Sequence, residues 1–338
     1  TSTLPQPTST ETEPYIHDLE SNGTTLMTVS AWGVHRSRDG GATWQLVTAE
    51  IPDAGRDLLV LADGRFLLFG GMTSFLVAGS GAPVFTRLVV NNTGGGVTLT
   101  NTGINISNNL NMTTGLLNTS ASYPVTMLNG STTAAGTALS TSYVNGPMRY
   151  QKTTSGASTL NFPVGNAPDC RPVILTVSHA NGNMYYYTVT LYDASAAALG
   201  YTLPPSVTTV SHSHYYTIVR TNSGGTTQPV TDLSGNQQIQ IFFGANDGVT
   251  DGSTLTIVKN TYLAPTAWID IGGMGGPPAS GGANLTGSII STSSPTAFNS
   301  FSTFAIANKI GGVNVLPTEL LYFDAKPDNS QVDLTWAT

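Results

Sequence analysis

Residues Ile104–Thr119 have the sequence INISNNLNMTTGLLNT, in which short aliphatic pieces alternate with asparagine, threonine and serine. The pattern extends over residues 84–152, where short apolar pieces are separated by Asn, Gly, Thr or Ser and charged residues are rare. Strands this short are typical of a parallel β-helix or stacked solenoid, with aliphatic side chains inside and Asn or Thr ladders along it. A sandwich of very short strands is the competing interpretation. We therefore predict a β-helix-like or short-strand β region over residues 84–158.

The composition of the whole chain favours an all-β protein. Only 9% of the 338 residues are charged while 39% are hydrophobic, whereas soluble domains usually contain about 25% charged residues. Thr, Ser, Asn and Gly lie between β-branched runs, which favours strands and turns over helices. The net charge of -7 with 12 Lys and Arg argues against a nucleic-acid-binding groove. No apolar run is long enough for a membrane-spanning helix, and the single Cys170 excludes an intrachain disulfide.

Downstream of the solenoid region, residues 159–315 are predicted to form a β-sandwich. Apolar or alternating runs recur there, separated by turns rich in Gly, Pro, Asn and Asp, which is typical of antiparallel sandwiches. The predicted strands are Val173–Ser178, Met184–Tyr192, Tyr215–Arg220, Gln237–Phe243, Thr254–Lys259, Ala267–Ile271, Gly287–Ser291 and Phe301–Asn308.

Upstream, residues 1–14 are rich in Pro and Thr and are predicted to be a linker or arm. Residues 15–83 contain a turn motif, S-x-D-x-G-x-T-W, formed by Ser37, Asp39, Gly41, Thr43 and Trp44. This segment resembles one Asp-box blade of a β-propeller, in which the carboxylate accepts backbone N–H groups across a hairpin. In sialidases, which also contain it, the motif is a structural turn, so the resemblance implies a structural role for Asp39. Because the motif occurs once and propellers need several blades, we predict either a lone Asp-box hairpin or a single propeller blade whose neighbouring blades would lie upstream of this sequence.

The last segment, Leu316–Thr338, contains two strand-like runs, Glu319–Ala325 and Gln331–Trp336, joined by the turn segment Lys326–Ser330. A two-stranded hairpin is marginally stable on its own, so these strands need partners from this chain, a continuation of it or a neighbouring subunit. The residues of a possible inter-subunit strand are Glu319, Leu320, Leu321, Tyr322, Phe323, Val332, Leu334 and Trp336.

The same segment matches the pattern LP-x-E-L-x-x-F-x-A followed by V-x-L-x-W-x-T. It resembles the start of the C-terminal fibronectin-III-like or sorting region of Bacteroidota surface proteins exported by type IX secretion. Residues 142–148 (SYVNGPM) and 162–165 (FPVG) extend the resemblance to large surface proteins of that group. The resemblance implies an exported, extracellular or cell-surface chain, and an incomplete Ig-like or fibronectin-III-like segment over residues 316–338.

Two groups of residues are candidate metal ligands. His212 and His214 would face one side of a strand and could share a metal ion, although a polar sandwich face is the favoured interpretation because a third ligand is not evident. Asn246, Asp247 and Asp251 could bind Ca²⁺ through oxygen ligands, but the segment lacks the D-x-D-x-D-G order. A hairpin turn with solvated acids is therefore favoured, and no other cofactor is indicated.

The sequence contains no G-x-S-x-G motif, and Cys170 has no paired base nearby. We therefore predict a protein without catalytic activity: an adhesin-like surface protein or a filament subunit that assembles with copies of itself by β-strand addition. The alternative is a module of a secreted glycoside hydrolase that binds surface glycans. A propeller-type glycosidase is the third and least favoured hypothesis, because it would need blades that this sequence does not contain.

Overall fold

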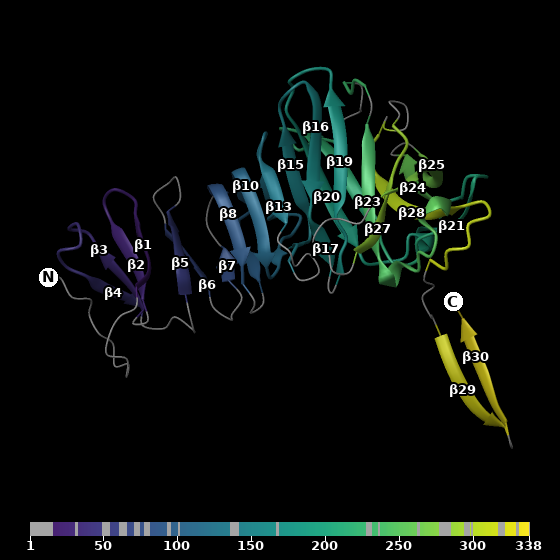
Figure 1. The fold of residues 1–338 in the computed structure, drawn as a ribbon, viewed down its shortest axis with the longest axis horizontal. Helices are drawn as coiled ribbons and strands as arrows, with labels where there is room; N and C mark the ends of the chain where they lie inside the picture. The colour runs from purple at the N-terminus through teal and green to yellow at the C-terminus, as the bar shows by residue number, and fades with distance from the viewer. Residues whose placement is uncertain are drawn as a thin grey trace. The chain divides into compact units, whose positions relative to one another are not determined.

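The computed structural model describes residues 16–30, 33–48, 55–60, 66–70, 75–77, 82–92, 96–100, 102–135, 142–166, 169–227, 232–235, 237–261, 264–276, 285–293, 298, 300–316, 322–328 and 331–337 (Figure 1). The chain divides into two compact units, Thr1–Asn145 and Gly146–Thr338. Strands dominate both units, which confirms the predicted all-β class. The helices of the described residues are short 3-10 turns: η1 (Ala197–Leu199), η2 (Ala245–Asp247) and η3 (Gly252–Thr254). Within the described ranges, no helix has the length and apolar character needed to cross a membrane.

The first unit starts with an antiparallel sheet of strands in chain order. These strands are β1 (Ile16–Ser21), β2 (Leu26–Ser30), β3 (Gly33–Ser37) and β4 (Gln45–Thr48). Val29 and Val34 are buried against each other and against Met27. A separate hairpin follows, formed by β5 (Gly55–Val60) and β6 (Phe66–Gly70).

The solenoid occupies the rest of the first unit, and its chain passes back and forth between two parallel sheets for about 3 turns. One sheet contains β7 (Phe75–Val77), β9 (Val97–Leu99), β11 (Leu117–Asn118) and β14 (Val144–Asn145). The other contains β8 (Val84–Asn91), β10 (Ile104–Thr114), β12 (Val125–Met127) and β13 (Thr132–Ala135). The predicted solenoid is therefore confirmed, whereas the short strands expected within Ile104–Thr119 include one continuous strand of 11 residues, β10.

Successive solenoid turns are held by aligned side chains. Val97, Leu117 and Val144 are in register and buried, so aliphatic side chains fill the interior. The next position in the same strands forms a polar ladder: the Asn145 Nδ2 donates to the Asn118 Oδ1 at 2.8 Å, and the Asn118 Nδ2 donates to the Thr98 Oγ1 at 3.2 Å. The alternation of apolar and Asn/Thr residues therefore orders the stack of turns.

One corner of the solenoid requires glycine. Gly115 follows β10 with a φ of 85°, and the Asn92 N–H donates to the Thr114 carbonyl at 2.8 Å across adjacent turns. A Cβ atom at Gly115 would lie 1.8 Å from the Asn92 carbonyl oxygen. Only glycine therefore fits this close approach of two backbones.

The second unit contains two antiparallel sheets in contact, a sandwich. One sheet contains β15 (Met148–Lys152), β20 (Tyr185–Tyr192), β22 (Tyr215–Asn222), β28 (Thr303–Lys309), β24 (Leu255–Thr261) and β25 (Ala264–Asp270), with β21 (Val207–Val210) also paired to β28. The other contains β16 (Gly156–Phe162), β19 (Val173–His179), β23 (Gln238–Gly244), β27 (Leu285–Ile290) and β26 (Met274–Gly276). A short pair is formed by β17 (Val164–Asn166) and β18 (Asp169–Cys170). Tyr150 of the first sheet packs edge-on against Phe162 of the second at 4.9 Å between ring centroids.

Two lysines lie inside the second unit, and the described part of the chain shows no carboxylate paired with either. Lys152 donates to the Ser158 hydroxyl at 2.8 Å, and Lys259, which is 1% exposed, donates to the Ser300 hydroxyl at 3.0 Å. Burial lowers the pKa of Lys259 to about 8 from its ordinary 10.5, because the charged ammonium loses its hydration.

This lowered pKa gives a pH dependence of stability that Lys259→Met is expected to abolish. Since the folded pKa lies below the unfolded one, the folded state gains stability as pH rises from about 8 to 10.5. Over that range the unmodified protein should gain about 3 kcal/mol relative to the variant. Urea unfolding at a series of pH values measures the difference. Lys326→Met, at an exposed position, is the control, and equal slopes in the protein and Lys259→Met would contradict the expectation.

Candidate functional site

A buried ion pair joins two distant loops of the second unit. Arg171 follows β18 and Asp247 ends η2, and the Arg171 Nε donates to the Asp247 Oδ2 at 2.8 Å. Both side chains are almost completely buried. The same carboxylate oxygen accepts the Gly244 N–H at 2.6 Å, and the Arg171 Nη1 donates to the Cys170 carbonyl at 2.9 Å. The pair therefore fixes the η2 loop against the β18 loop.

A histidine and a serine complete this network from the loop between β21 and β22. The His214 Nδ1 lies 3.1 Å from the Asp247 Oδ1, and the Ser213 hydroxyl donates to the same oxygen at 3.0 Å. Because an ionised carboxylate only accepts hydrogen bonds, the His214 proton lies on Nδ1. The Tyr216 hydroxyl donates to the Arg171 carbonyl at 3.1 Å and so connects β22 to the same network.

The Asp247 carboxyl group is ionised in this network. Burial acts to raise its pKa, but the hydrogen bond from His214, the electrostatic interactions with His214 and Arg171 and the hydrogen bond from the Gly244 N–H outweigh it. Together they hold the pKa of Asp247 well below the ordinary value of 3.8. At neutral pH the charged Asp247 therefore contributes an internal ion pair rather than a proton donor.

The positions of Ser213, His214 and Asp247 differ from those of a catalytic triad. In a triad the acid and the serine contact opposite nitrogens of the histidine, so that the histidine removes the serine proton. Here the Ser213 Oγ lies 3.0 Å from Nδ1, the nitrogen that also faces Asp247, and it donates its proton to the carboxylate. This geometry orients the loop and does not activate Ser213 as a nucleophile.

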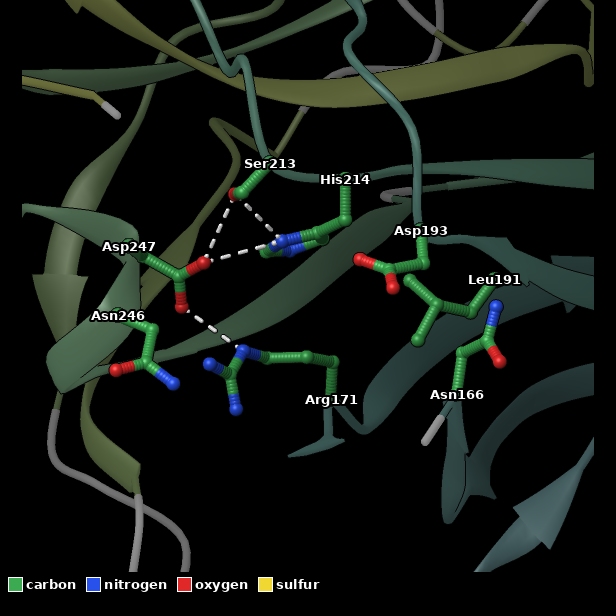
Figure 2. Close-up of a pocket in the computed structure, with 8 residues that line it drawn as sticks. All are labelled: Asn166, Arg171, Leu191, Asp193, Ser213, His214, Asn246 and Asp247. Carbon is green, nitrogen blue, oxygen red and sulfur yellow. Dashed lines mark hydrogen bonds and ion pairs between the residues drawn. The ribbon is translucent and has the colours of Figure 1, made fainter. Parts of the chain in front are cut away.

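A pocket of about 110 Å³ opens beside the network. Figure 2 shows the side chains around it: Asn166, Arg171, Leu191, Asp193, Ser213, His214, Asn246 and Asp247. They come from β17, the loop after β18, the end of β20, the β21–β22 loop and η2. Asp193 and Asn246 are exposed, whereas Arg171, His214 and Asp247 are buried. The pocket is therefore polar, with a fixed charged base and an accessible rim.

The structure separates the residues that the sequence groups as metal ligands. His212 and His214 lie in a loop, so the predicted strand position is wrong. The His214 ring also contacts the Asp247 carboxylate. Asp247 is held by Arg171, while the Asp251 carboxylate accepts from the backbone and hydroxyl of Ser253 at 2.9 and 2.6 Å. In the described ranges, no three or more His, Cys, Asp or Glu side chains gather in a metal-binding arrangement.

The residues of the S-x-D-x-G-x-T-W motif form the turn between β3 and β4. The Asp39 carboxylate accepts the Ser37 hydroxyl at 2.7 Å, the Thr43 hydroxyl at 2.5 Å and the Thr43 N–H at 2.9 Å. The bonds from Thr43 and then Ser37 lower the pKa of Asp39 to about 2. Gly41 has a φ of 93°, and a Cβ there would lie 3.8 Å from the Trp44 ring. All these bonds are local, so the residues stabilise the turn itself.

The C-terminal hairpin consists of β29 (Tyr322–Asp328) and β30 (Gln331–Ala337). The predicted turn segment Lys326–Ser330 is too long, because Lys326 to Asp328 continue the first strand. Of the residues predicted for an inter-subunit strand, Glu319, Leu320 and Leu321 lie outside the described residues, and the others lie in the hairpin.

The register gives this hairpin two different faces. Phe323 pairs with Trp336, Ala325 with Leu334 and Pro327 with Val332, whereas the intervening pairs are Asp324 with Thr335 and Lys326 with Asp333. Because paired residues lie on the same face of a sheet, one face is apolar and the other polar. Phe323, Val332 and Leu334 are 59%, 59% and 52% exposed. No further strand among the described residues pairs with either edge of this hairpin, and the exposure of Phe323, Val332 and Leu334 leaves its apolar face open to solvent.

Sequence reasoning missed Arg171 and Ser213 as members of the buried network. Arg171 is one of 12 Lys and Arg residues. The rarity of charged residues in this chain is the one sequence feature that could have indicated an internal ion pair at Arg171. Its partner lies 76 residues away, a distance that no local pattern spans.

Comparisons with protein-family models, curated proteins and solved structures give no match to this chain.

Proposed function

We propose that this chain is a non-catalytic structural protein of a bacterial cell surface that associates with copies of itself through the β29–β30 hairpin. The observation that carries the proposal is the uncovered apolar face formed by Phe323, Ala325, Pro327, Val332 and Leu334. Fully covering one side chain of this size contributes about 1.5–3 kcal/mol. The hairpin thus gains considerable stability when a partner sheet covers it.

The geometry of the hairpin suits strand addition. In a two-stranded sheet each strand has one outer edge with unpaired backbone N–H and C=O groups. A strand of a second copy supplies the missing hydrogen bonds at this edge. The widened apolar face is then covered when two such sheets pack face to face. The charged residues of the hairpin, Asp324, Lys326, Asp328 and Asp333, belong to the pairs of its polar face, so a contact through the apolar face leaves them in water.

The placement outside the cell is supported by the resemblance of residues 316–338 to the C-terminal regions of exported Bacteroidota surface proteins. The Asp-box interpretation of the β3–β4 turn belongs to the same proposal, as a structural hairpin. The turn contacts of Asp39 are consistent with that role, because Ser37 and Thr43 occupy its carboxylate.

Glycan binding is the second candidate function, as an accessory module of a secreted glycoside hydrolase. The observation that favours it is the polar pocket next to Arg171 and Asp247. This function is compatible with self-association, because the hairpin and the pocket share no residues.

Sedimentation velocity over a concentration series, together with negative-stain electron microscopy, tests self-association. We expect the unmodified chain to form oligomers or filaments. The double variant Phe323→Ser/Leu334→Ser should raise the dissociation constant at least about a hundredfold, because two large apolar contacts are lost.

The control changes the opposite face of the same hairpin. Asp324→Ser/Thr335→Ala alters directly paired residues on the polar face and should assemble as the unmodified chain does. A chain ending at Val315 should be monomeric. Monomers at every concentration of the unmodified chain, or unchanged assembly of the apolar-face variant, would refute the proposal.

A further inference from the structure

We infer that the pocket beside Arg171 and Asp247 binds a neutral, hydroxyl-rich ligand, the terminal sugar unit of a glycan. This inference rests on the second candidate function, glycan binding, and does not depend on self-association through the hairpin. It rests on the rigidity of the pocket base, on the mixture of groups around it and on its accessible rim.

The base of the pocket is preorganised. Arg171 is fixed by the Asp247 carboxylate and the Cys170 carbonyl, and the His214 ring is fixed by Asp247 and by edge-on packing against Tyr216 at 5.5 Å. These side chains are buried, so they lose little conformational freedom when a ligand binds. Preorganised polar groups are a general property of small-molecule sites.

The groups around the pocket include both donors and acceptors. Arg171 donates, the carboxylate of Asp193 accepts, and the side-chain amides of Asn166 and Asn246 do both. A sugar hydroxyl also donates and accepts at the same time, and neighbouring hydroxyls on a ring match planar amide, carboxylate and guanidinium groups. Leu191 provides one apolar contact for the C–H groups of the ring.

Other ligand classes fit less well. An anion would meet the carboxylates of Asp193 and Asp247, while an apolar ligand would find Leu191 as the one aliphatic side chain among the eight lining residues. A metal ion would have to compete with Arg171 for Asp247, whose carboxylate oxygen lies 2.8 Å from the Arg171 Nε. The volume of about 110 Å³ suits the hydroxyl-bearing edge of one sugar ring, with the rest of a glycan in solvent.

Saturation-transfer-difference NMR and titration calorimetry test the inference. The probes are the methyl glycosides of glucose, galactose, mannose and N-acetylglucosamine, with calcium chloride and inorganic phosphate as competing ligand classes. We expect at least one glycoside to bind with a dissociation constant of about a millimolar. Asp193→Asn and Asn246→Ala change exposed rim residues and should each weaken binding about tenfold without lowering the melting temperature.

Asp333→Asn is the matched control, because it removes an exposed carboxylate in β30, away from the lining residues. It should leave binding unchanged. Binding of none of the glycosides, equal binding by the rim variants, or saturable binding of calcium or phosphate alone would overturn the inference. The chain ending at Val315 retains every lining residue of the pocket but lacks the hairpin. Glycoside binding by this truncated chain therefore tests the pocket independently of self-association.

Discussion

Asp247→Ala is expected to lower the free energy of unfolding of the Gly146–Thr338 unit by about 3 kcal/mol or more. The variant leaves Arg171 inside the fold and removes the carboxylate that lies 2.8 Å from its Nε. It also removes the acceptor for His214, Ser213 and the Gly244 N–H. Hydrogen exchange of peptides from β22 and β23, followed by mass spectrometry in increasing urea, measures this loss within the unit.

The same change should remove a pH dependence. The pKa of Asp247 in the folded protein lies well below the value of about 3.9 found in unfolded chains. Its contribution to stability is therefore present above about pH 4 and is lost as the pH falls below that value. The unmodified protein should show this acid-dependent loss, and the variant should show less of it.

Two controls distinguish the ion pair from general damage to the loop. Asp251→Ala removes an exposed carboxylate that caps η3 in the same loop and should cost about 1 kcal/mol. The double variant Arg171→Met/Asp247→Leu should be less destabilised than the sum of its single changes, because no buried charge is left unpaired. An Asp247→Ala protein with unchanged exchange protection would contradict the expectation.

Gly115→Ala is expected to destabilise the solenoid by about 3 kcal/mol. The positive φ of 85° strains any residue with a Cβ, which costs about 1–2 kcal/mol. The new Cβ would also lie 1.8 Å from the Asn92 carbonyl oxygen, so adjacent turns must move apart, which costs about another 1–3 kcal/mol. Faster hydrogen exchange in peptides covering β10 and β11 would report the loss.

Gly130→Ala is a matched control in the same unit. Its φ is 83°, but a Cβ there would have no atom within 4 Å. It should therefore show the conformational cost alone, about 1–2 kcal/mol. Equal effects of the two substitutions would show that the close approach at the solenoid corner does not contribute.

The fold could be predicted largely because its strands have local signals. In the sandwich, alternating residues such as those of Val173–His179 are buried and half-buried in turn, which gives a period of two in the sequence. In the solenoid, the repeated apolar and Asn/Thr positions identify the stack, but they do not show that β10 runs unbroken from Ile104 to Thr114. The intervening Ser107 and Asn108 are exposed, and their polarity imitates a turn.

The candidate site was harder to predict because it depends on contacts between distant loops. His214 was identified by its spacing from His212, but the loop before β22 turns the two side chains into different environments. Asp247 was identified as a possible Ca²⁺ ligand, because no residue near it in the sequence indicates that its partner is Arg171. The hairpin shows the opposite case, because its apolar and polar faces follow directly from alternation in residues 322–337.

The parallel stacking of the solenoid also has a mechanical consequence. Each turn is bonded to its neighbours through β9, β11 and β14 on one side and through β8, β10 and β12 or β13 on the other. Because such a stack depends on nearest-neighbour contacts, a pulling force that detaches an outer turn leaves the next turn intact. The solenoid would thus extend stepwise under load and absorb work at each step, whereas long antiparallel ladders such as β20 with β22 must yield as a whole when sheared.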